Sequence, residues 1–256
     1  MIKPIYMTKR FWDKKNTGMK VKICNMKYLD VAYESAILGA DALGFHVWKT
    51  SDVEGKILEF RHIIKFLPKE VSYWMLTDIY EPYVLKKVLD KVDFDTIQFQ
   101  GKVGSSKFQD LICELSSRRK KNELMIVKTI SLDVDSKYED ILKIAQVFSK
   151  SVDALLFDSK RKGRWKGGTG IIHNWELSAE LVKNIGKPVI LAGGLTPKNV
   201  FQAIKKVRPY GVDVESGVET VVGTYKNREI KCKSIMKIKE FISECKQFDY
   251  GFDKIV

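Results

Sequence analysis

The sequence is poor in the residues that build metal centres and disulfide frameworks. Its 256 residues include only four cysteines and three histidines. No pair of cysteines has a CxxC spacing, which argues against a structural zinc site and against a disulfide framework. We therefore expect no bound metal, and free thiols in a reducing cytoplasm. The cysteines are Cys24, Cys113, Cys232 and Cys245.

The chain also lacks long apolar runs. None approaches the roughly 20 residues that a helix needs to span a membrane. Residues 1–20 are basic and aromatic but lack the apolar core of a signal peptide. No stretch rich in proline and glycine divides the chain, so we expect a single domain. These absences predict a cytoplasmic protein without a membrane partner.

Acidic residues are outnumbered by basic ones. There are 45 Lys and Arg against 32 Asp and Glu, a formal charge of +13. Such an excess can indicate a nucleic-acid partner. Here the basic residues are mostly lysines scattered along the chain, and short runs such as 118–121 are typical of a solvated helix end. We do not expect nucleic-acid binding, and an anionic small-molecule substrate suits the same charge.

Apolar runs rich in β-forming residues alternate with helical patterns through the chain. Consecutive parallel strands take right-handed crossovers, and eight of them close into a (β/α)8 TIM barrel of the α/β class. We expect residues 20–256 to form this barrel as one catalytic domain, and residues 1–19 to be an N-terminal extension outside it. The expected strands are 21–24, 42–47, 71–76, 96–99, 124–129, 154–157, 189–191 and 212–214, and the first five helices lie near 28–38, 57–66, 83–89, 108–116 and 138–148.

Glycine-containing loops follow the last three of these strands. Glycine lets a loop approach a ligand closely and adopt positive φ, and the amides of such loops bind phosphate. In a (β/α)8 barrel the usual phosphate site lies on the loops after strands seven and eight. We therefore predict a phosphate site in this part of the chain. Its candidate residues are Gly168, Gly193, Gly194, Ser216 and Gly217.

Five motifs together carry a family resemblance. Val-Lys-Ile-Cys ends at Cys24, Gly-Ala-Asp-Ala-Leu-Gly-Phe fills 39–45, and Asp158 precedes a Gly-Gly-Thr-Gly run. Leu-Ala-Gly-Gly-Leu at 191–195 and Ser-Gly-Val-Glu at 216–219 complete the set. In these segments, within roughly residues 20 to 244, the chain resembles the phosphoribosylanthranilate isomerases, (β/α)8 enzymes of tryptophan biosynthesis.

The resemblance implies a cofactor-free aldose-ketose isomerase, an intramolecular oxidoreductase. Its reaction is the Amadori rearrangement of N-(5-phosphoribosyl)anthranilate to 1-(2-carboxyphenylamino)-1-deoxyribulose 5-phosphate. An acid protonates the furanose ring oxygen, and a base then removes the C2′ proton from the iminium. By residue match, Cys24 is implied as the general base and Asp158 as the general acid. The alternatives are a buried inert thiol for Cys24 and a helix-capping or Lys160-paired carboxylate for Asp158.

Asn25 stands where the family has glycine after the cysteine, and three larger departures follow. Near the C-terminus the family's Gly-x-Lys-Asp becomes Gly-Thr-Tyr-Lys-Asn at 223–227, followed by extra residues. The loop at 48–52 lacks the family's arginine that contacts the anthranilate carboxylate, which leaves Lys49 as the candidate aglycone contact. A lysine cannot reproduce the bidentate fork of an arginine. After the fourth expected strand, Gln100 replaces the family's histidine.

These departures keep two alternatives open. One is a divergent paralogue that acts on a different phosphoribosyl or sugar-phosphate substrate. The other is a non-catalytic barrel that binds phosphate or RNA, although a silent barrel would not need both Cys24 and Asp158. The oligomeric state is open as well, with a homodimer as one alternative.

A few further residues receive interpretations. The loop at 160–166 carries five cations, with a mobile lid and a solvated loop as equal alternatives. His46 is interpreted as a core histidine, with assistance to proton transfer as the alternative. Asp213 is expected to order neighbouring loops, and Glu219 to occupy the first turn of a helix. The other three cysteines are expected to pack within helices.

Overall fold

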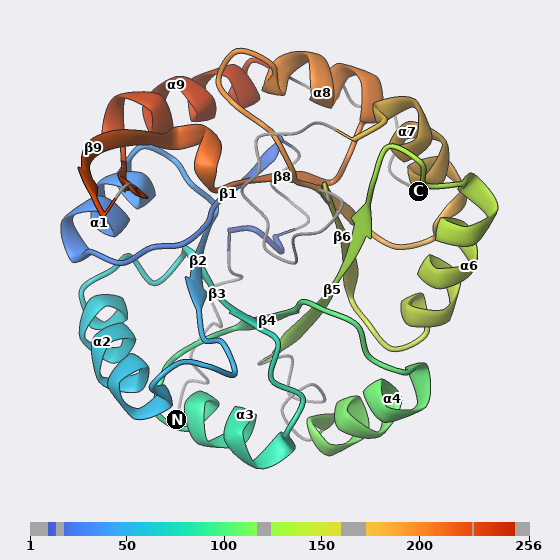
Figure 1. The fold of residues 1–256 in the computed structure, drawn as a ribbon, viewed down its shortest axis with the longest axis horizontal. Helices are drawn as coiled ribbons and strands as arrows, with labels where there is room; N and C mark the ends of the chain where they lie inside the picture. The colour runs from blue at the N-terminus through green and yellow to red at the C-terminus, as the bar shows by residue number, and fades with distance from the viewer. Residues whose placement is uncertain (1–9, 14–17, 117–123, 160–172, 227, 249–256) are drawn as a thin grey trace, which may run out of the picture.

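Eight parallel strands pair in sequence order, and the last pairs with the first to close a barrel. A computed structural model describes residues 10–13, 18–116, 124–159, 173–226 and 228–248. Helices surround the strands on all sides (Figure 1). The sequence prediction of a (β/α)8 barrel is therefore confirmed.

The elements follow the expected alternation. The strands of the barrel are β1 (Lys20–Ile23), β2 (Ala42–His46), β3 (Ser72–Thr77), β4 (Thr96–Phe99), β5 (Met125–Leu132), β6 (Ala154–Ser159), β7 (Val189–Leu191) and β8 (Gly211–Val214). The helices are α1 (Leu29–Ile37), α2 (Val53–Lys65), α3 (Pro82–Leu89), α4 (Ser105–Glu114), α6 (Tyr138–Ser149), α7 (Trp175–Asn184), α8 (Val200–Val207) and α9 (Ile235–Lys246). Strands β4 and β7 have the predicted bounds, and β5 runs three residues beyond its prediction, to Leu132 rather than to 129.

Two apolar layers hold the barrel together. Successive side chains of a strand point to opposite faces, so each strand of a closed barrel supplies both layers. The outer layer lies between strands and helices and includes Val21, Ile23 and Phe45. The inner layer fills the barrel and includes Trp74, Leu156 and other side chains of the alternate phase. Because both faces are buried, these strands appear in the sequence as nearly continuous apolar runs.

The N-terminal end of the barrel is closed by a segment that precedes β1. Phe11 is fully buried there, and the Trp12 ring stacks on Trp74 with centroids 5.4 Å apart and planes 4° apart. The Tyr210 hydroxyl donates to the Phe11 carbonyl at 2.9 Å. Residues 10–13 thus pack against the barrel. The domain boundary expected at residue 19 stays a prediction.

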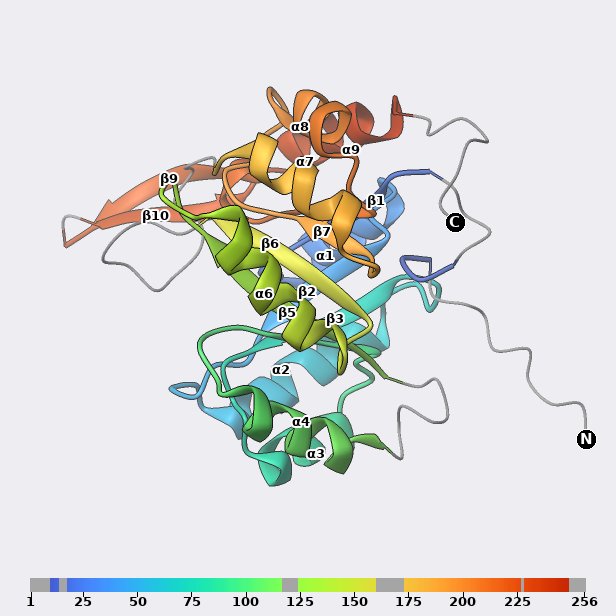
Figure 2. The ribbon, with the colours of Figure 1, turned by 90° about the vertical axis from the view of Figure 1, so that its right-hand side faces the viewer.

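A two-stranded hairpin interrupts the last repeat. After β8, a short 3-10 turn (Ser216–Val218) leads into β9 (Glu219–Tyr225) and antiparallel β10 (Arg228–Lys233) before α9 begins. In Figure 2 the hairpin projects from the end of the barrel opposite to the dark-blue segment 10–13. The prediction of a helical turn at Glu219 is wrong, since Glu219 begins β9 and pairs with Lys233 at 3.1 Å. Cys232 lies in β10 rather than in a helix.

None of the helices within the described ranges has the length and apolar character that crossing a membrane requires.

Candidate active site

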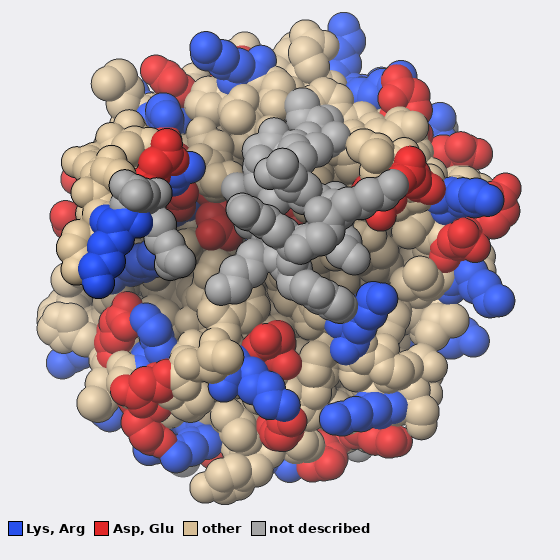
Figure 3. All heavy atoms as spheres, in the orientation of Figure 1, with Lys and Arg blue, Asp and Glu red and all other residues tan. Residues whose placement is uncertain are grey.

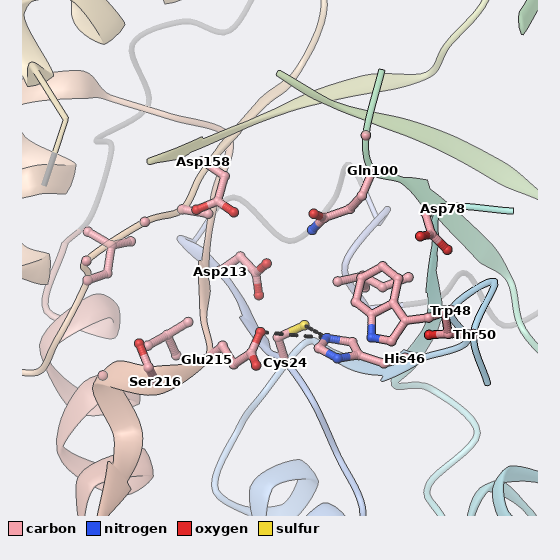
Figure 4. A pocket seen from close by; sticks show the side chains of 18 residues that line it. Cys24, His46, Trp48, Thr50, Asp78, Gln100, Asp158, Asp213, Glu215 and Ser216 are labelled. Atoms are coloured by element: carbon pink, nitrogen blue, oxygen red, sulfur yellow. Dashed lines mark hydrogen bonds and ion pairs between the residues drawn. The ribbon is translucent and has the colours of Figure 1, made fainter. Parts of the chain in front are cut away.

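A cavity of about 430 Å³ opens at the C-terminal ends of the barrel strands. Active sites of (β/α)8 enzymes lie at this end of the barrel. Figure 4 shows the lining side chains converging from several strands. On the face drawn in Figure 3, basic and acidic side chains are interspersed around the rim rather than gathered in one basic block. The described lining residues are Cys24, His46, Trp48, Thr50, Leu76, Asp78, Gln100, Gly101, Asp158, Ala192, Gly193, Gly194, Leu195, Asp213, Val214, Glu215, Ser216 and Gly217.

Cys24, His46 and Glu215 meet on one wall of this cavity. Strand register explains their meeting: Ile23 is paired with Val214 of β8 and with Leu43 of β2, so Cys24 follows on the inward phase beside both strands. The Cys24 Sγ lies 3.5 Å from the Nε2 atom of His46. The same Nε2 lies 3.7 Å from the Oε2 atom of Glu215. Three strands that are adjacent in the barrel therefore bring a thiol, an imidazole and a carboxylate together.

A buried ion pair lies beneath this group. Lys22 Nζ is 2.8 Å from the Oδ2 atom of Asp213, and the lysine side chain is fully buried. Burial by itself lowers the pKa of Lys22, but the Asp213 carboxylate and the neighbouring Cys24 raise it above its ordinary value. Lys22 is therefore a fixed positive charge near the Cys24 sulfur. Gly44 leaves room for both, because a Cβ there would lie 2.9 Å from Sγ and 3.1 Å from Nζ.

Asp158 lines the cavity near the C-terminal end of β6, as predicted. Burial raises the pKa of its carboxyl group to about 7, and the Asp213 and Glu215 carboxylates act in the same direction. A carboxyl group with this pKa is half protonated at neutral pH. It can therefore donate a proton under conditions in which an ordinary aspartate is ionised.

Burial also determines the charge of Cys24 and His46. It raises the pKa of the Cys24 thiol, against which Lys22 acts in the opposite direction. It lowers the pKa of His46 to about 4, even though Glu215 acts to raise it. Both groups are neutral in the free protein at neutral pH. The interpretation of His46 as a core histidine is corrected to this extent: it lines the cavity in contact with Cys24.

The two late glycine motifs lie side by side on the same wall of the cavity. Gly193 and Gly194 have φ angles of 87° and 67°, and a Cβ on Gly193 would collide with Ser159 of β6. A Cβ on Gly217 would collide with the Leu195 carbonyl oxygen. Close packing between the loops after β7 and β8 thus depends on glycine. Gly168 and the basic loop at 160–166 lie outside the described residues.

The opposite wall of the cavity is built by the loops after β2, β3 and β4. Trp48, Thr50, Asp78 and Gln100 line it, and Figure 4 places them across from Asp158. Lys49 is not among the lining residues. Its side chain is 68% exposed and its Nζ lies 3.4 Å from Glu81, while its backbone N–H donates to Asp78 at 2.7 Å. The structure therefore does not support the expectation that Lys49 contacts the aglycone.

Sequence reasoning missed two members of the site. Lys22 was considered only as part of a strand motif, and Glu215 only as a residue next to a glycine motif. The alternation of β1 and β8 was a usable signal, because Lys22 shares its phase with Cys24, and Glu215 shares its phase with Asp213. Asp213 was expected to order loops, and instead holds Lys22 inside the barrel.

The family model described as N-(5'phosphoribosyl)anthranilate (PRA) isomerase matches residues 79–242. A Petrotoga mobilis protein named N-(5'-phosphoribosyl)anthranilate isomerase is 35% identical over 217 residues, which cover 83% of this chain and 94% of that protein.

Solved structures agree with the sequence relatives. The phosphoribosyl anthranilate isomerase from Thermotoga maritima has a TM-score of 0.70 and 26% identity, covering 90% of this chain and all of that one. A structure of the enzyme in complex with reduced 1-(O-carboxyphenylamino)-1-deoxyribulose 5-phosphate has a TM-score of 0.67 and 25% identity over 90% of this chain. The barrel, its cavity and these matches lead to one conclusion: the chain belongs to the N-(5'-phosphoribosyl)anthranilate isomerase family.

Proposed function

We propose that this chain catalyses the Amadori rearrangement of N-(5-phosphoribosyl)anthranilate to 1-(2-carboxyphenylamino)-1-deoxyribulose 5-phosphate. The observation that carries the proposal is Asp158, whose pKa of about 7 suits a proton donor and which lines one cavity together with Cys24 and the late glycine loops. The reaction is an internal redox change within the sugar. It needs one positioned acid and one positioned base.

Asp158 is assigned as the general acid. Its carboxyl proton is transferred to the furanose ring oxygen while the C1′–O bond breaks, which leaves an iminium at C1′ and a hydroxyl at C4′. The electron pair of the aglycone nitrogen forms the new C–N π bond, so no external electron acceptor is consumed. Burial of Asp158 among other carboxylates supports the assignment, because it raises the pKa of the group to about 7 and so leaves a large protonated fraction at neutral pH.

Cys24 is assigned as the general base. It removes the C2′ proton from the iminium, and the C2′–H electron pair forms the enolamine that tautomerises to the ketone product. The position of Cys24 supports the role, since it follows β1 at the edge of the cavity. Burial raises the pKa of the thiol overall, and the fixed charge of Lys22 beneath it acts in the opposite direction, toward the thiolate.

The substrate phosphate is assigned to the glycine loops after β7 and β8, with Gly193, Gly194, Ser216 and Gly217 as its contacts. Support comes from their position on the lining and from the close packing that Gly217 permits against Leu195. Loops of this kind present backbone amides to a phosphate. Gly168 is kept as a proposed contact from the sequence alone.

The aglycone is assigned to the wall formed by Trp48, Thr50 and Gln100. The indole, hydroxyl and amide groups of these side chains offer neutral hydrogen-bond donors to a carboxylate, in the place where Lys49 was expected to supply a charge. The indole of Trp48 also offers a surface on which an aromatic ring can stack.

Two further proposals concern the cellular location and the oligomeric state. We assign the protein to the cytoplasm, in keeping with its free cysteines. A homodimer is the second, and it is supported only by analogy: one solved relative, at TM-score 0.68, is described as a monomer derived from the dimeric enzyme of Thermotoga maritima.

A fluorescence assay with phosphoribosylanthranilate generated in situ tests the reaction. The wild type is expected to consume the substrate, and Cys24→Ala and Asp158→Asn are each expected to abolish most of the turnover. Cys113→Ser serves as the matched control, because this thiol is exposed on α4. Wild-type protein that binds phosphate esters, as shown by a raised melting temperature, but shows no turnover would contradict the proposed substrate.

A further inference from the structure

Among the described residues, one group of side chains has the geometry of a metal site. The Cys24 sulfur, a His46 ring nitrogen and a Glu215 carboxylate oxygen all lie within 4.8 Å of one another. Figure 4 shows the three side chains directed toward one another at the edge of the cavity. Thiolate, imidazole and carboxylate are the three protein ligand types that zinc accepts.

Two of the distances between these atoms are close to the edges of a zinc tetrahedron, and the third, between sulfur and carboxylate oxygen, is within 4.8 Å. Typical bond lengths of about 2.3 Å to sulfur and about 2.0 to 2.1 Å to nitrogen and oxygen imply ligand–ligand separations of roughly 3.3 to 3.6 Å. The observed separations are 3.5 Å between Sγ and Nε2 and 3.7 Å between Nε2 and Oε2. An ion can therefore enter with only small adjustments of the side chains.

Neighbouring groups hold the carboxylate in the required orientation. The side-chain amide of Asn25 donates to Glu215 Oε1 at 2.9 Å, which leaves Oε2 facing His46. Lys233 Nζ donates to the Glu215 backbone carbonyl at 2.6 Å and fixes the chain beneath it. Partners that orient a ligating carboxylate in this way are a regular part of protein metal sites.

The charges also suit a divalent cation. Metal binding releases the proton of the Cys24 thiol to water, after which the thiolate and the Glu215 carboxylate supply two negative charges, while Lys22 is already paired with Asp213. All three ligand residues line the cavity, so a fourth coordination position faces it. Three protein ligands and one open position are typical of zinc sites at which a water or another small molecule completes the shell.

We propose that Cys24, His46 and Glu215 form a binding site for a divalent transition cation of the zinc class. This proposal departs from the expectation of no bound metal that the cysteine spacing suggested. Because a metal-bound thiolate is not free to take up a proton, occupancy removes Cys24 from base chemistry. Zinc then acts as a reversible inhibitor of the isomerase, and that consequence alone rests on the proposed function.

Cobalt titration tests the site without reference to activity. The protein used is the untagged full chain with Cys113→Ser and Cys232→Ser, two substitutions that remove the accessible thiols elsewhere. This protein is titrated with Co²⁺. We expect one equivalent to bind with a near-ultraviolet thiolate–cobalt absorption, and Zn²⁺ to displace it. His46→Gln and Glu215→Ser are each expected to weaken binding by more than about 100-fold, since loss of an orienting partner alone costs about 10- to 100-fold.

A subtler variant examines the orienting contact. Asn25 has a φ of 64°, which glycine tolerates, so Asn25→Gly keeps the backbone and removes only the amide that holds Glu215. It is expected to weaken metal binding by about 10- to 100-fold. Circular dichroism and the melting temperature establish that each variant is folded.

The outcomes separate the two proposals. Cobalt binding that is absent, or that is unchanged in both folded ligand variants, overturns the metal site whatever the activity. A site-dependent cobalt spectrum in a protein without isomerase activity leaves the metal site standing and overturns the proposed function. Inhibition by Zn²⁺ that chelator reverses is expected in the Cys113→Ser, Cys232→Ser protein.

Discussion

The two walls of the cavity differ in how closely they follow the family pattern. The wall after β6, β7 and β8 carries Asp158 and the paired glycine loops, each with the residue that the family motifs led us to expect. The wall after β2, β3 and β4 has neutral donors where the family has an arginine and a histidine. One wall is fixed by close backbone packing, since Gly217 lies against the Leu195 carbonyl. The other is built from loop side chains that can change without disturbing a strand.

The largest expected effect lies on the wall after β6, β7 and β8, at Asp158. Asp158→Asn cannot donate a proton, so kcat is expected to fall by about 10²- to 10⁴-fold, which is typical of a lost general acid. The melting temperature should not fall, because the change removes a carboxyl group that burial disfavours in its charged form. Steady-state kinetics and thermal melting measure both. An Asp158→Asn enzyme with kcat within threefold of wild type would remove this residue from the acid role.

A substitution at Gly217 tests the wall after β6, β7 and β8. Gly217→Ala forces a Cβ against the Leu195 carbonyl, so the loops after β7 and β8 must separate. We expect KM to rise by about tenfold or more, together with a loss of about 1 to 3 kcal/mol of stability from overpacking. Gly186→Ala is the matched control, because a Cβ there meets nothing within 4 Å. Equal kinetics for the two variants would show that close packing of these loops does not matter to the substrate.

The pH dependence examines the same side of the cavity. Burial raises the folded-state pKa of Asp158 to about 7, so the proton donor is present below that pH and is lost as pH rises through it. Cys24 must lose its proton to act as the base, and burial raises its pKa, so above pH 7 the growing thiolate fraction offsets the loss of the acid. The kcat/KM is therefore expected to rise with pH up to about pH 7 and to level off above it. A pH–rate profile of the wild type provides the measurement. A kcat/KM that keeps rising about tenfold per pH unit from pH 6 to 9 contradicts the assignment of Asp158 as the acid.

The smallest effect is expected at Lys49, which follows β2 next to the wall after β2, β3 and β4. Lys49 is exposed and, among the described residues, forms an ion pair with Glu81, and exposed ion pairs contribute about 0 to 1 kcal/mol. Lys49→Ala should therefore change KM by less than about threefold. Thr50→Ala, which alters a lining residue, serves as the comparison and should raise KM more. A Lys49→Ala effect that exceeds that of Thr50→Ala would show that the lysine reaches the substrate after all.

Strand periodicity and family motifs were sufficient to predict the barrel, and they selected Cys24, Asp158 and the late glycine loops, which line one cavity. Both kinds of signal are local in the chain. The contact of His46 and Glu215 with Cys24 depends on the register of three strands far apart in the sequence. Periodicity gives the phase of each strand but not its register, so this meeting could not be predicted.

The hairpin was missed for a related reason. Residues 219–233 alternate as a strand pair, but a helix was expected there because every earlier strand is followed by one. Lys49 was assigned by elimination as the only cation in its loop. Its direction depends on the backbone contact between its N–H and Asp78, for which the sequence carries no local signal.

Residues 10–13, which cover the N-terminal end of the barrel, limit how far the chain can be shortened. Lys20 Nζ donates to the carbonyls of Arg10 and Asp13 at 3.1 and 3.2 Å, and burial lowers its pKa to about 8. Translation initiated at Met19 would yield all eight strands but would remove both acceptors and the ring that covers Trp74. In such a product the indole of Trp74 and the ammonium group of Lys20 would be exposed to water at the N-terminal end of the barrel. We therefore expect the smallest cooperative folding unit of this protein to start upstream of its first repeat.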